Sequence, residues 1–382
     1  MSQEFSHKNL LLTSPTRAFG CIQRYVQGPG EINNVFALGR KYGDNFFFII
    51  DTGVFEMIRD MIERIDDKCG CTYTFKSFFG ECCKENVAEL ADAVKKSGCN
   101  VVLGVGGGKV LDTVKLVADE ADVARIIVPT SASSDAPAAD WAAVYDINGV
   151  HLGGVPTKRC TELVLVDSAI IAKAPARLFA AGIADALVTW FEALANSKAL
   201  TPNYIGRGYA ISKAGMAIAK VCYDTLLEEG KQAYDAVKAK LLTGAVEDII
   251  EANVLLSGLG FMNTGCAGAH GVHNGISELE QSNKFLHGEK VAFGLICQLV
   301  LENADMELIE KMMAFMDSID LPITMDQMEI ELSDENLDII VHHTFYKNAL
   351  IHREPLTVTP EAVRTAIVAA NTFGRQFLAN KK

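Results

Sequence analysis

The sequence predicts a chain of two parts, an α/β domain over residues 1–174 and an all-helical domain over residues 175–382. Three observations lead to this prediction. The length of 382 residues exceeds what one hydrophobic core usually holds. Short apolar runs alternate with helical segments in the first part only. After Pro175, apolar residues recur every three or four positions in long segments, as in helices, and almost no segment has the pattern of a strand.

In the first part, three apolar runs have the length of strands and are followed by turn-forming or small residues: residues 45–51, 101–106 and 126–130. Helical stretches lie between them, at residues 86–97 and 111–119. Strands that alternate with helices form a parallel sheet with helical crossovers. We therefore expect a Rossmann-like domain here.

The second part contains three long segments with helical spacing: residues 176–200, 246–261 and 287–304. Pro175 precedes the first of them and suits the first turn of a helix, where a missing N–H group costs nothing. The change from alternating strand-like and helical segments to helical segments alone places the boundary between the two domains at residues 174 and 175.

Charge and composition restrict the partners. The net charge of −13 argues against nucleic acids and anionic membranes, because both are bound by basic surfaces. The apolar patch Leu10–Leu12 is too short for the core of a secretory signal, and no run reaches membrane-spanning length. The ten cysteines lack the paired spacing of a structural zinc site and are expected to be reduced thiols. We expect a cytoplasmic protein whose partners are small molecules and copies of itself.

A glycine-rich stretch, Gly104-Val-Gly-Gly-Gly-Lys-Val-Leu-Asp112, lies where an apolar strand gives way to a helix. Glycines let the backbone approach a pyrophosphate, and the helix that follows offers free N–H groups and the positive end of its dipole. The spacing matches neither the dinucleotide fingerprint in its usual place nor a Walker motif. A glycine-rich turn without a ligand is the alternative.

Two other features are expected at the same edge of the sheet. Asp51 ends a strand, where its carboxylate could bind a ribose diol and repel a 2′-phosphate, which favours NAD over NADP. It could equally shape a turn. The run of small hydroxyl residues at 130–137 (TSASSDAP) could bind phosphate or the nicotinamide amide, although a plain serine-rich loop would look similar.

Three residues of the second part suggest a metal site. Asp185 lies in an otherwise apolar helix, where a carboxylate is costly unless it is paired with a charge or a metal. His270 and His273 share one helix face, and His287 follows after a stretch long enough to fold back beside them. Asp185, His270 and His287 would provide three ligands and leave one position open, as in a catalytic zinc site. Taken singly, each could be an ordinary hydrogen-bonded polar residue.

Together these motifs resemble those of the glycerol dehydrogenases in the iron-containing (group III) alcohol dehydrogenase family. The matching segments are spread over about half the chain, in the order and spacing of the family, at residues 104–115, 128–137, 182–193, 268–275 and 287–294. The resemblance implies the dehydroquinate synthase-like fold, with an amino-terminal nucleotide-binding domain, a carboxy-terminal helical domain and an active site between them. It also implies a homo-oligomer.

The resemblance places the metal ligands on Asp185, His270 and His287. Other branches of the family use iron and a further histidine at the position of Thr189, so the resemblance favours Zn²⁺ over Fe²⁺ here. It places the substrate-contacting aspartate on Asp135. The positions it implies for NAD are Asp51, Gly107, Gly108, Lys109, Asp112, Thr130, Ser133, Trp141 and Tyr145.

The chain departs from the family at Ala139 and Trp141, where the family usually has serine and leucine. The larger Trp141 could reshape the substrate end and puts glycerol itself in doubt, more than the chemistry.

The implied reaction is the NAD-dependent oxidation of glycerol, or a similar vicinal diol, at the secondary hydroxyl to give dihydroxyacetone. The metal would lower the pKa of that hydroxyl, so that hydride can leave for the nicotinamide ring. Asp135 would hold another hydroxyl. His273 could pass the proton outward or only support the metal ligands.

Three other kinds of protein are alternatives to a glycerol dehydrogenase. Glycerol-1-phosphate dehydrogenase and 3-dehydroquinate synthase bind phosphorylated substrates and should place several basic residues near the metal. Residues 255–294 offer only Lys284 and Lys290, which ranks these enzymes lower. Another metal-dependent alcohol dehydrogenase, with iron, comes next. A non-catalytic protein that binds NAD or stores metal would keep the fold without turning over a diol.

Overall fold

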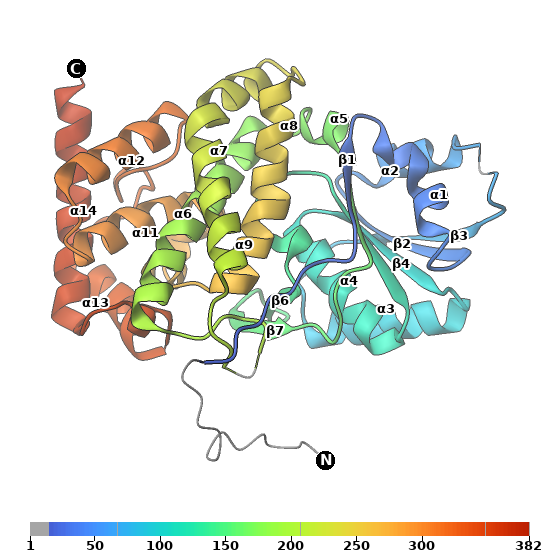
Figure 1. Ribbon diagram of the computed structural model, residues 1–382, viewed down its shortest axis with the longest axis horizontal. Helices are drawn as coiled ribbons and strands as arrows, with labels where there is room; N and C mark the ends of the chain where they lie inside the picture. The colour runs from blue at the N-terminus through green and yellow to red at the C-terminus, as the bar shows by residue number, and fades with distance from the viewer. Residues whose placement is uncertain (1–14, 67, 207, 348, 382) are drawn as a thin grey trace, which may run out of the picture.

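The structure is a computed structural model that describes residues 15–66, 68–206, 208–347 and 349–381. The patch Leu10–Leu12, used above in the prediction of localisation, lies outside these residues. A sheet-containing part and a helical part lie side by side, with the helical part formed by the second half of the chain (Figure 1). The predicted fold class is confirmed.

The sheet has six strands, and every neighbouring pair is parallel. In spatial order they are β1 (Tyr25–Gly28), β8 (Leu163–Asp167), β5 (Ala124–Pro129), β4 (Val101–Gly106), β2 (Asn45–Asp51) and β3 (Thr72–Phe78). The three predicted strands correspond to β2, β4 and β5. The edge strands β1 and β3 were not predicted, because neither has a buried apolar run: all of β1 is half-buried and most of β3 is exposed. The apolar run of β8 was overlooked.

Side chains of the central strands alternate between two faces of the sheet. Phe46, Phe48 and Ile50 of β2 join one hydrophobic cluster with residues of α2 (Phe55–Glu63) and of the segment that contains α1 (Val35–Gly39). Phe47 and Ile49 join a second cluster with α3 (Lys84–Ser97) and α4 (Gly108–Ala121). The second cluster continues into the helical part, so one hydrophobic core joins the two parts of the molecule.

The strand order reverses direction between β2 and β4. The chain leaves β2 for β3 on one side, and leaves β4 for β5 on the other. Ligands of open α/β sheets bind at the carboxyl ends of strands beside such a switch point. Asp51 ends β2 and Gly107 follows β4, so both lie at this position.

A short antiparallel pair, β6 (Trp141–Tyr145) and β7 (His151–Pro156), follows the 3-10 turn η3 (Ala136–Ala138) and was not predicted. The backbone N–H of Tyr145 donates to the carbonyl of Cys82 at 2.9 Å. This bond holds the pair against the segment that follows β3.

After β8, the described residues form helices joined by loops. The elements of this part are α5 (Ser168–Ile171), α6 (Ala176–Ala199), α7 (Lys213–Lys238), α8 (Gly244–Glu251), η4 (Ala252–Leu256), α9 (Ser257–Thr264), α10 (Gly268–Ile276), η5 (Glu280–Lys284), α11 (His287–Leu301), α12 (Met306–Ser318), α13 (Asp334–His342), η6 (His343–Lys347), η7 (Ala349–Arg353) and α14 (Pro360–Asn380). The predicted segment 246–261 is α8 and most of α9, joined by the π-helical turn η4. Pro175 is the N-cap of α6 rather than its first helical residue.

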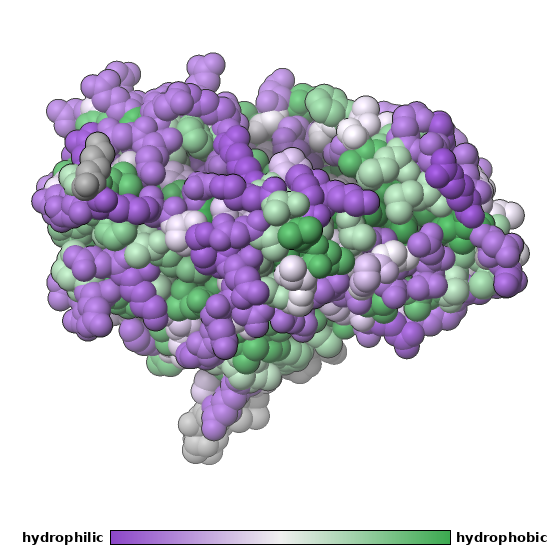
Figure 2. Space-filling view, turned by 90° about the horizontal axis from the view of Figure 1, so that it is seen from above, coloured by the Kyte–Doolittle hydropathy of each residue, from purple (hydrophilic) through white to green (hydrophobic). Residues whose placement is uncertain are grey.

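Helix α6 is the central element of this part. It is long and apolar enough to cross a membrane by length and composition, but 83% of its most apolar window is buried inside the protein, as in a core helix. Seen from above, hydrophilic side chains are spread over both parts, with hydrophobic residues in smaller patches between them (Figure 2). The domain boundary at 174 and 175 stays a prediction, because the core is continuous across it.

Candidate active site

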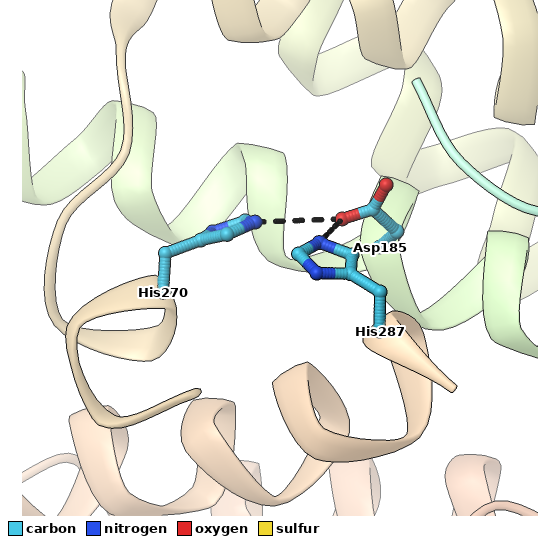
Figure 3. A group of neighbouring side chains, drawn as sticks. All are labelled: Asp185, His270 and His287. Atoms are coloured by element: carbon cyan, nitrogen blue, oxygen red, sulfur yellow. Dashed lines mark hydrogen bonds and ion pairs between the residues drawn. The ribbon is translucent and has the colours of Figure 1, made fainter. Parts of the chain in front are cut away.

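Asp185, His270 and His287 converge from three helices (Figure 3). Asp185 lies in α6, His270 in the first turn of α10, and His287 is the first residue of α11. Oδ1 of Asp185 lies 3.1 Å from Nε2 of His287 and 3.5 Å from Nε2 of His270. The three potential ligand atoms all lie within 4.8 Å of one another. Two imidazole nitrogens and one carboxylate oxygen suit a divalent transition metal such as zinc.

The two oxygens of Asp185 have different partners. Oδ1 faces the imidazoles, while Oδ2 accepts a hydrogen bond from the backbone N–H of Asp135 at 3.2 Å. Asp185 is only 2% exposed. Burial raises the pKa of this carboxyl, but His287 and His270 together hold it well below its ordinary value. Asp185 is therefore an anionic ligand whose second oxygen is fixed by the loop after β5.

Glu192 holds His270 from behind. It lies in α6, seven residues after Asp185, and is 1% exposed. Its Oε2 lies 2.7 Å from Nδ1 of His270, and its Oε1 accepts the backbone N–H of the same residue at 2.9 Å. Because a carboxylate only accepts, Nδ1 must carry a proton, which makes Nε2, the nitrogen on the side of Asp185, the one available to a metal. Cys266 completes a second group of potential ligands with Glu192 and His270, but both oxygens of Glu192 are already used within the protein.

His273 supports His287 in the same way. Its Nε2 lies 3.0 Å from Nδ1 of His287, and its Nδ1 lies 2.9 Å from Oδ1 of Asn274. Burial and the neighbouring His287 and Lys290 lower the pKa of His273 well below its ordinary value, so the ring is neutral. A neutral ring that donates to Asn274 accepts from His287, which directs the free nitrogen of His287 toward Asp185. The support role predicted for His273 therefore fits this geometry, while its role in proton transfer stays a prediction.

Access to the three ligands lies on the side of His287, whose side chain is 42% exposed, against 13% for His270. Thr189, one turn after Asp185, is buried and approaches the hydroxyl of Ser257 at 3.3 Å. Its hydroxyl is a weak metal ligand compared with the histidine of the iron branches. The donor set therefore consists of three residues with an accessible side, as a catalytic metal site requires.

Asp135 lies next to this centre. Burial and the nearby Asp185 carboxylate raise the pKa of Asp135 to about 8. Its backbone also packs against α9, since a Cβ on Gly258 would lie 2.8 Å from the Asp135 carbonyl. This position beside the metal ligands fits the predicted contact of Asp135 with substrate, which stays a prediction.

The glycine stretch forms the amino terminus of α4. Gly107 is its N-cap, and no side chain among the described residues caps it. A Cβ on Gly107 would meet no atom within 4 Å, and one on Gly108 none within 3.4 Å. By contrast, a Cβ on Gly106 would lie 2.9 Å from that of Asp51. Packing within the protein thus explains the glycine at 106 but not those at 107 and 108, which fits close approach by a ligand.

Lys109 is the second residue of α4, and Tyr145 lies close to its side chain. Lys109 Nζ forms an ion pair with Glu81 and lies 5.7 Å from the centre of the Tyr145 ring. The Lys109 side chain is 57% exposed, so it can reach a phosphate. Oδ1 of Asp51 accepts the N–H of Gly53 at 2.8 Å, which is the turn-shaping role weighed above. The cofactor contacts of all three residues stay predictions.

Of the remaining predicted cofactor positions, Thr130 and Ser133 lie in the loop after β5, whereas Asp112 and Trp141 form hydrogen bonds inside the protein. Thr130 donates its N–H to the Gly106 carbonyl at 3.1 Å, and the hydroxyl of Ser133 lies 3.1 Å from that of Ser131, so this loop lies against the glycine stretch. Asp112 is buried and binds Lys115 and the N–H of Ala143, so its carboxylate already has partners inside the protein. Trp141 directs its indole N–H to the Tyr204 carbonyl at 3.2 Å.

Three supporting residues were missed from the sequence. Glu192 lies two turns after Asp185 on an apolar helix, and this spacing places both carboxylates on one face. Lys115 is fully buried and donates to Asp112 and to the carbonyls of Ala136 and Trp141, which fixes the loop that carries Asp135. Only the first of these has a clear sequence signal. Glu81 lies in a loop, and its partner Lys109 is 28 residues away.

Comparisons with known proteins find relatives over most of the chain. Residues 23–168 match the model of the family described as iron-containing alcohol dehydrogenase. A glycerol dehydrogenase from Thermotoga maritima is 41% identical over 354 residues, which are 92% of this chain and 96% of that protein. One from Citrobacter freundii is 38% identical over 93% of this chain and 97% of its own length. The crystal structure of glycerol dehydrogenase from Schizosaccharomyces pombe superposes with a TM-score of 0.90 at 31% identity, covering 96% of this chain and 93% of that one.

Proposed function

The chain belongs to the iron-containing alcohol dehydrogenase family, and on this premise we propose that it oxidises glycerol with NAD as the hydride acceptor. The product would be dihydroxyacetone, formed at the secondary hydroxyl. The glycerol dehydrogenases of T. maritima and C. freundii, which match over more than nine-tenths of this chain, support glycerol as the substrate.

One structural observation supports the proposal in addition to the similarity to known glycerol dehydrogenases. The hydrogen bond from the Asp135 N–H to Oδ2 of Asp185 joins the loop after β5 to the metal ligands. That loop follows a strand at the carboxyl edge of the sheet, next to the glycine stretch that would bind the pyrophosphate. Hydride transfer needs the substrate carbon and the nicotinamide ring in contact, so the cofactor site and the metal site must share an edge. Asp135 is the residue at which they meet.

Each residue has a defined part in this reaction. Asp185, His270 and His287 would hold the metal, and Glu192 and His273 keep the two imidazoles in the correct tautomer. A metal held there would act as a Lewis acid and lower the pKa of a substrate hydroxyl. Asp135 would hold a neighbouring hydroxyl of the diol, and the loop fixed by Lys115 keeps it beside Asp185. His273 would support His287 and is the residue that we propose to pass a proton outward.

We further propose that the metal is zinc. Two imidazoles, one carboxylate and an accessible fourth side match catalytic zinc, and Thr189 supplies no nitrogen where the iron branches have histidine. Phosphorylated substrates fit less well, because Lys290 is 8% exposed and Lys284 pairs with Glu329. A homo-oligomer in the cytoplasm is proposed on the resemblance alone.

The test is NAD reduction by the purified protein, before and after treatment with a chelator, with zinc or iron then added back separately. We expect glycerol oxidation to be lost with the chelator and restored by zinc. Ethanol is the control substrate, since a diol-specific site should favour glycerol strongly over it. NAD binding without glycerol oxidation in either metal would contradict the proposal.

A further inference from the structure

The amino terminus of α10, which carries His270, is held by side chains from several parts of the chain. Five consecutive backbone N–H groups, those of residues 266–270, each donate to a side chain. Helices usually leave their first four N–H groups to water or to one capping residue. Here the acceptors are Tyr204, Glu192, Glu354 and Gln298, at 2.7 to 3.2 Å.

Glu354 is the most distant of these acceptors in sequence. It follows η7 and is 4% exposed. Its Oε1 accepts the N–H of Gly268 at 2.7 Å, two residues before the metal ligand. A Cβ on Gly268 would lie 2.4 Å from this oxygen, so the carboxyl group packs directly on the backbone.

The other oxygen of Glu354 indicates that the group is a neutral acid. Oε2 is buried and receives no hydrogen bond from the described residues, while the Glu302 carboxylate lies beside it. When two carboxyl groups share one site, ionisation of the more deeply buried one is disfavoured, and here that group is Glu354. Burial and the nearby Glu302 raise the pKa of Glu354 to about 9. A proton on Glu354 turns this contact into a hydrogen bond to Glu302.

Glu302 leads back to the same helix terminus. It accepts a hydrogen bond from Nε2 of Gln298 at 2.7 Å, and Oε1 of Gln298 accepts the N–H of Ala269 at 2.9 Å. Glu354, Glu302 and Gln298 therefore form one chain of hydrogen bonds between two adjacent backbone N–H groups. Together with Glu192, this chain leaves the first turn of α10 little freedom to rotate His270 away from Asp185.

We propose that Glu354, as a neutral carboxylic acid, is a positioning residue for the metal centre and sets the metal affinity through the first turn of α10. The inference rests on the proposed function, in that it assumes a metal on Asp185, His270 and His287. It adds a residue from the carboxy-terminal segment, 84 positions after His270, that touches neither substrate nor metal.

The test compares the zinc dissociation constants of four purified proteins by competition with a chromophoric chelator. They are the unmodified chain, Glu354→Gln, Glu354→Leu and the control Glu162→Leu. Glutamine reproduces a neutral acid, because its oxygen can accept from Gly268 and its amide can donate to Glu302. Glu162 is also a buried carboxylate that accepts a backbone N–H, from Arg125 at 3.1 Å, but it lies immediately before β8, away from the metal ligands in the chain.

We expect E354L to bind zinc about 10- to 100-fold more weakly, as is typical when a group behind a metal ligand is lost. E354Q should stay within about threefold of the unmodified chain. E162L should lose thermal stability without a change in zinc affinity. NAD affinity, measured by fluorescence, should be the same in all four proteins.

Two results would overturn the inference. Unchanged zinc affinity in E354L would show that Glu354 serves the fold alone, and E354Q as weak as E354L would show that an ionised carboxylate is required. If E354L does not fold, Gln298→Met removes the acceptor of the neighbouring N–H and carries the same expectation of weaker zinc binding. Failure of the unmodified chain to bind zinc would refute the proposed zinc site, and the inference with it, whereas the glycerol assay tests the proposed reaction separately.

Discussion

The metal end and the cofactor end of the site are built in opposite ways. At the metal end, His270 and His287 each have a second residue that fixes the ring, and Asp185 has a backbone partner for its outer oxygen. At the cofactor end, Gly107 faces open space, a Cβ on Gly108 would make only ordinary van der Waals contacts, and Lys109 is more than half exposed. The metal end is rigid before any ligand arrives, whereas the cofactor end consists of backbone left clear for one.

This difference has a physical reason. A metal ion needs a few donor atoms at fixed distances, so each donor must be held by further contacts. A pyrophosphate is bound mainly by backbone N–H groups and a helix dipole, which a single turn provides. Substitutions at the metal end should therefore affect metal binding and turnover with little effect on NAD binding, and those at the cofactor end the reverse.

The largest effect is expected for Asp185→Asn. It removes the only anionic ligand from a buried site, so turnover of glycerol should fall at least about 1,000-fold, equivalent to about 4 kcal/mol. Kinetics with saturating zinc would measure this loss. The dissociation constant for NAD should stay within about twofold, and a large change in it would mean that the two ends are not separate.

Glu192→Gln should have the next largest effect. Glutamine presents an amide donor either to Nδ1 of His270 or to the backbone N–H groups of Ala267 and His270, so it cannot reproduce both contacts of the carboxylate. Zinc affinity should weaken about 10- to 100-fold, as a chelator competition would show. Wild-type affinity in this variant would contradict the view that the metal end depends on its supporting residues.

Lys109→Met tests the cofactor end. Loss of the positive charge beside the helix terminus should raise the KM for NAD about tenfold, since a partly exposed charge contributes moderately. Zinc affinity should not change. Glu81→Gln, which keeps Lys109 but removes its partner, is the matched control. Weaker zinc binding in either variant would show that the ends are coupled.

The smallest effect is expected for Trp141→Leu. The indole donates to the Tyr204 carbonyl and packs against Gly154, so it is directed into the protein. We expect kcat/KM for glycerol to change by less than about threefold. Comparison of glycerol with 1,2-propanediol would measure any shift in preference, and a large one would restore the concern that Trp141 shapes the substrate end.

The two ends of the site also differ in how they could be predicted from the sequence. The glycine stretch, Asp51 and the strands beside them are contiguous segments, and their placement at the ends of these strands was predicted from local pattern, whereas the switch point is known only from the strand order. The convergence of Asp185, His270 and His287 was predicted too, through motifs in three separate segments together with a family resemblance.

Of the supporting residues, only His273 was predicted from the sequence, and Glu354 comes from a distant part of the chain. Glu354 meets Gly268 across 86 positions, and no local pattern indicates that contact. The edge strands β1 and β3 were missed because their hydrophobic signal is weak where one face meets solvent. The packing of helices, rather than the spacing within any one of them, determines which polar groups meet.

The most direct test of the rigid metal end is X-ray absorption spectroscopy at the zinc edge on the metal-loaded protein. The account predicts two imidazole nitrogens and one carboxylate oxygen at about 2.0–2.2 Å, without sulfur in the first shell. Glu192, Cys266 and His270 are the alternative group of metal ligands. A sulfur ligand at about 2.3 Å would place the metal on Cys266 and contradict the assignment of Asp185, His270 and His287.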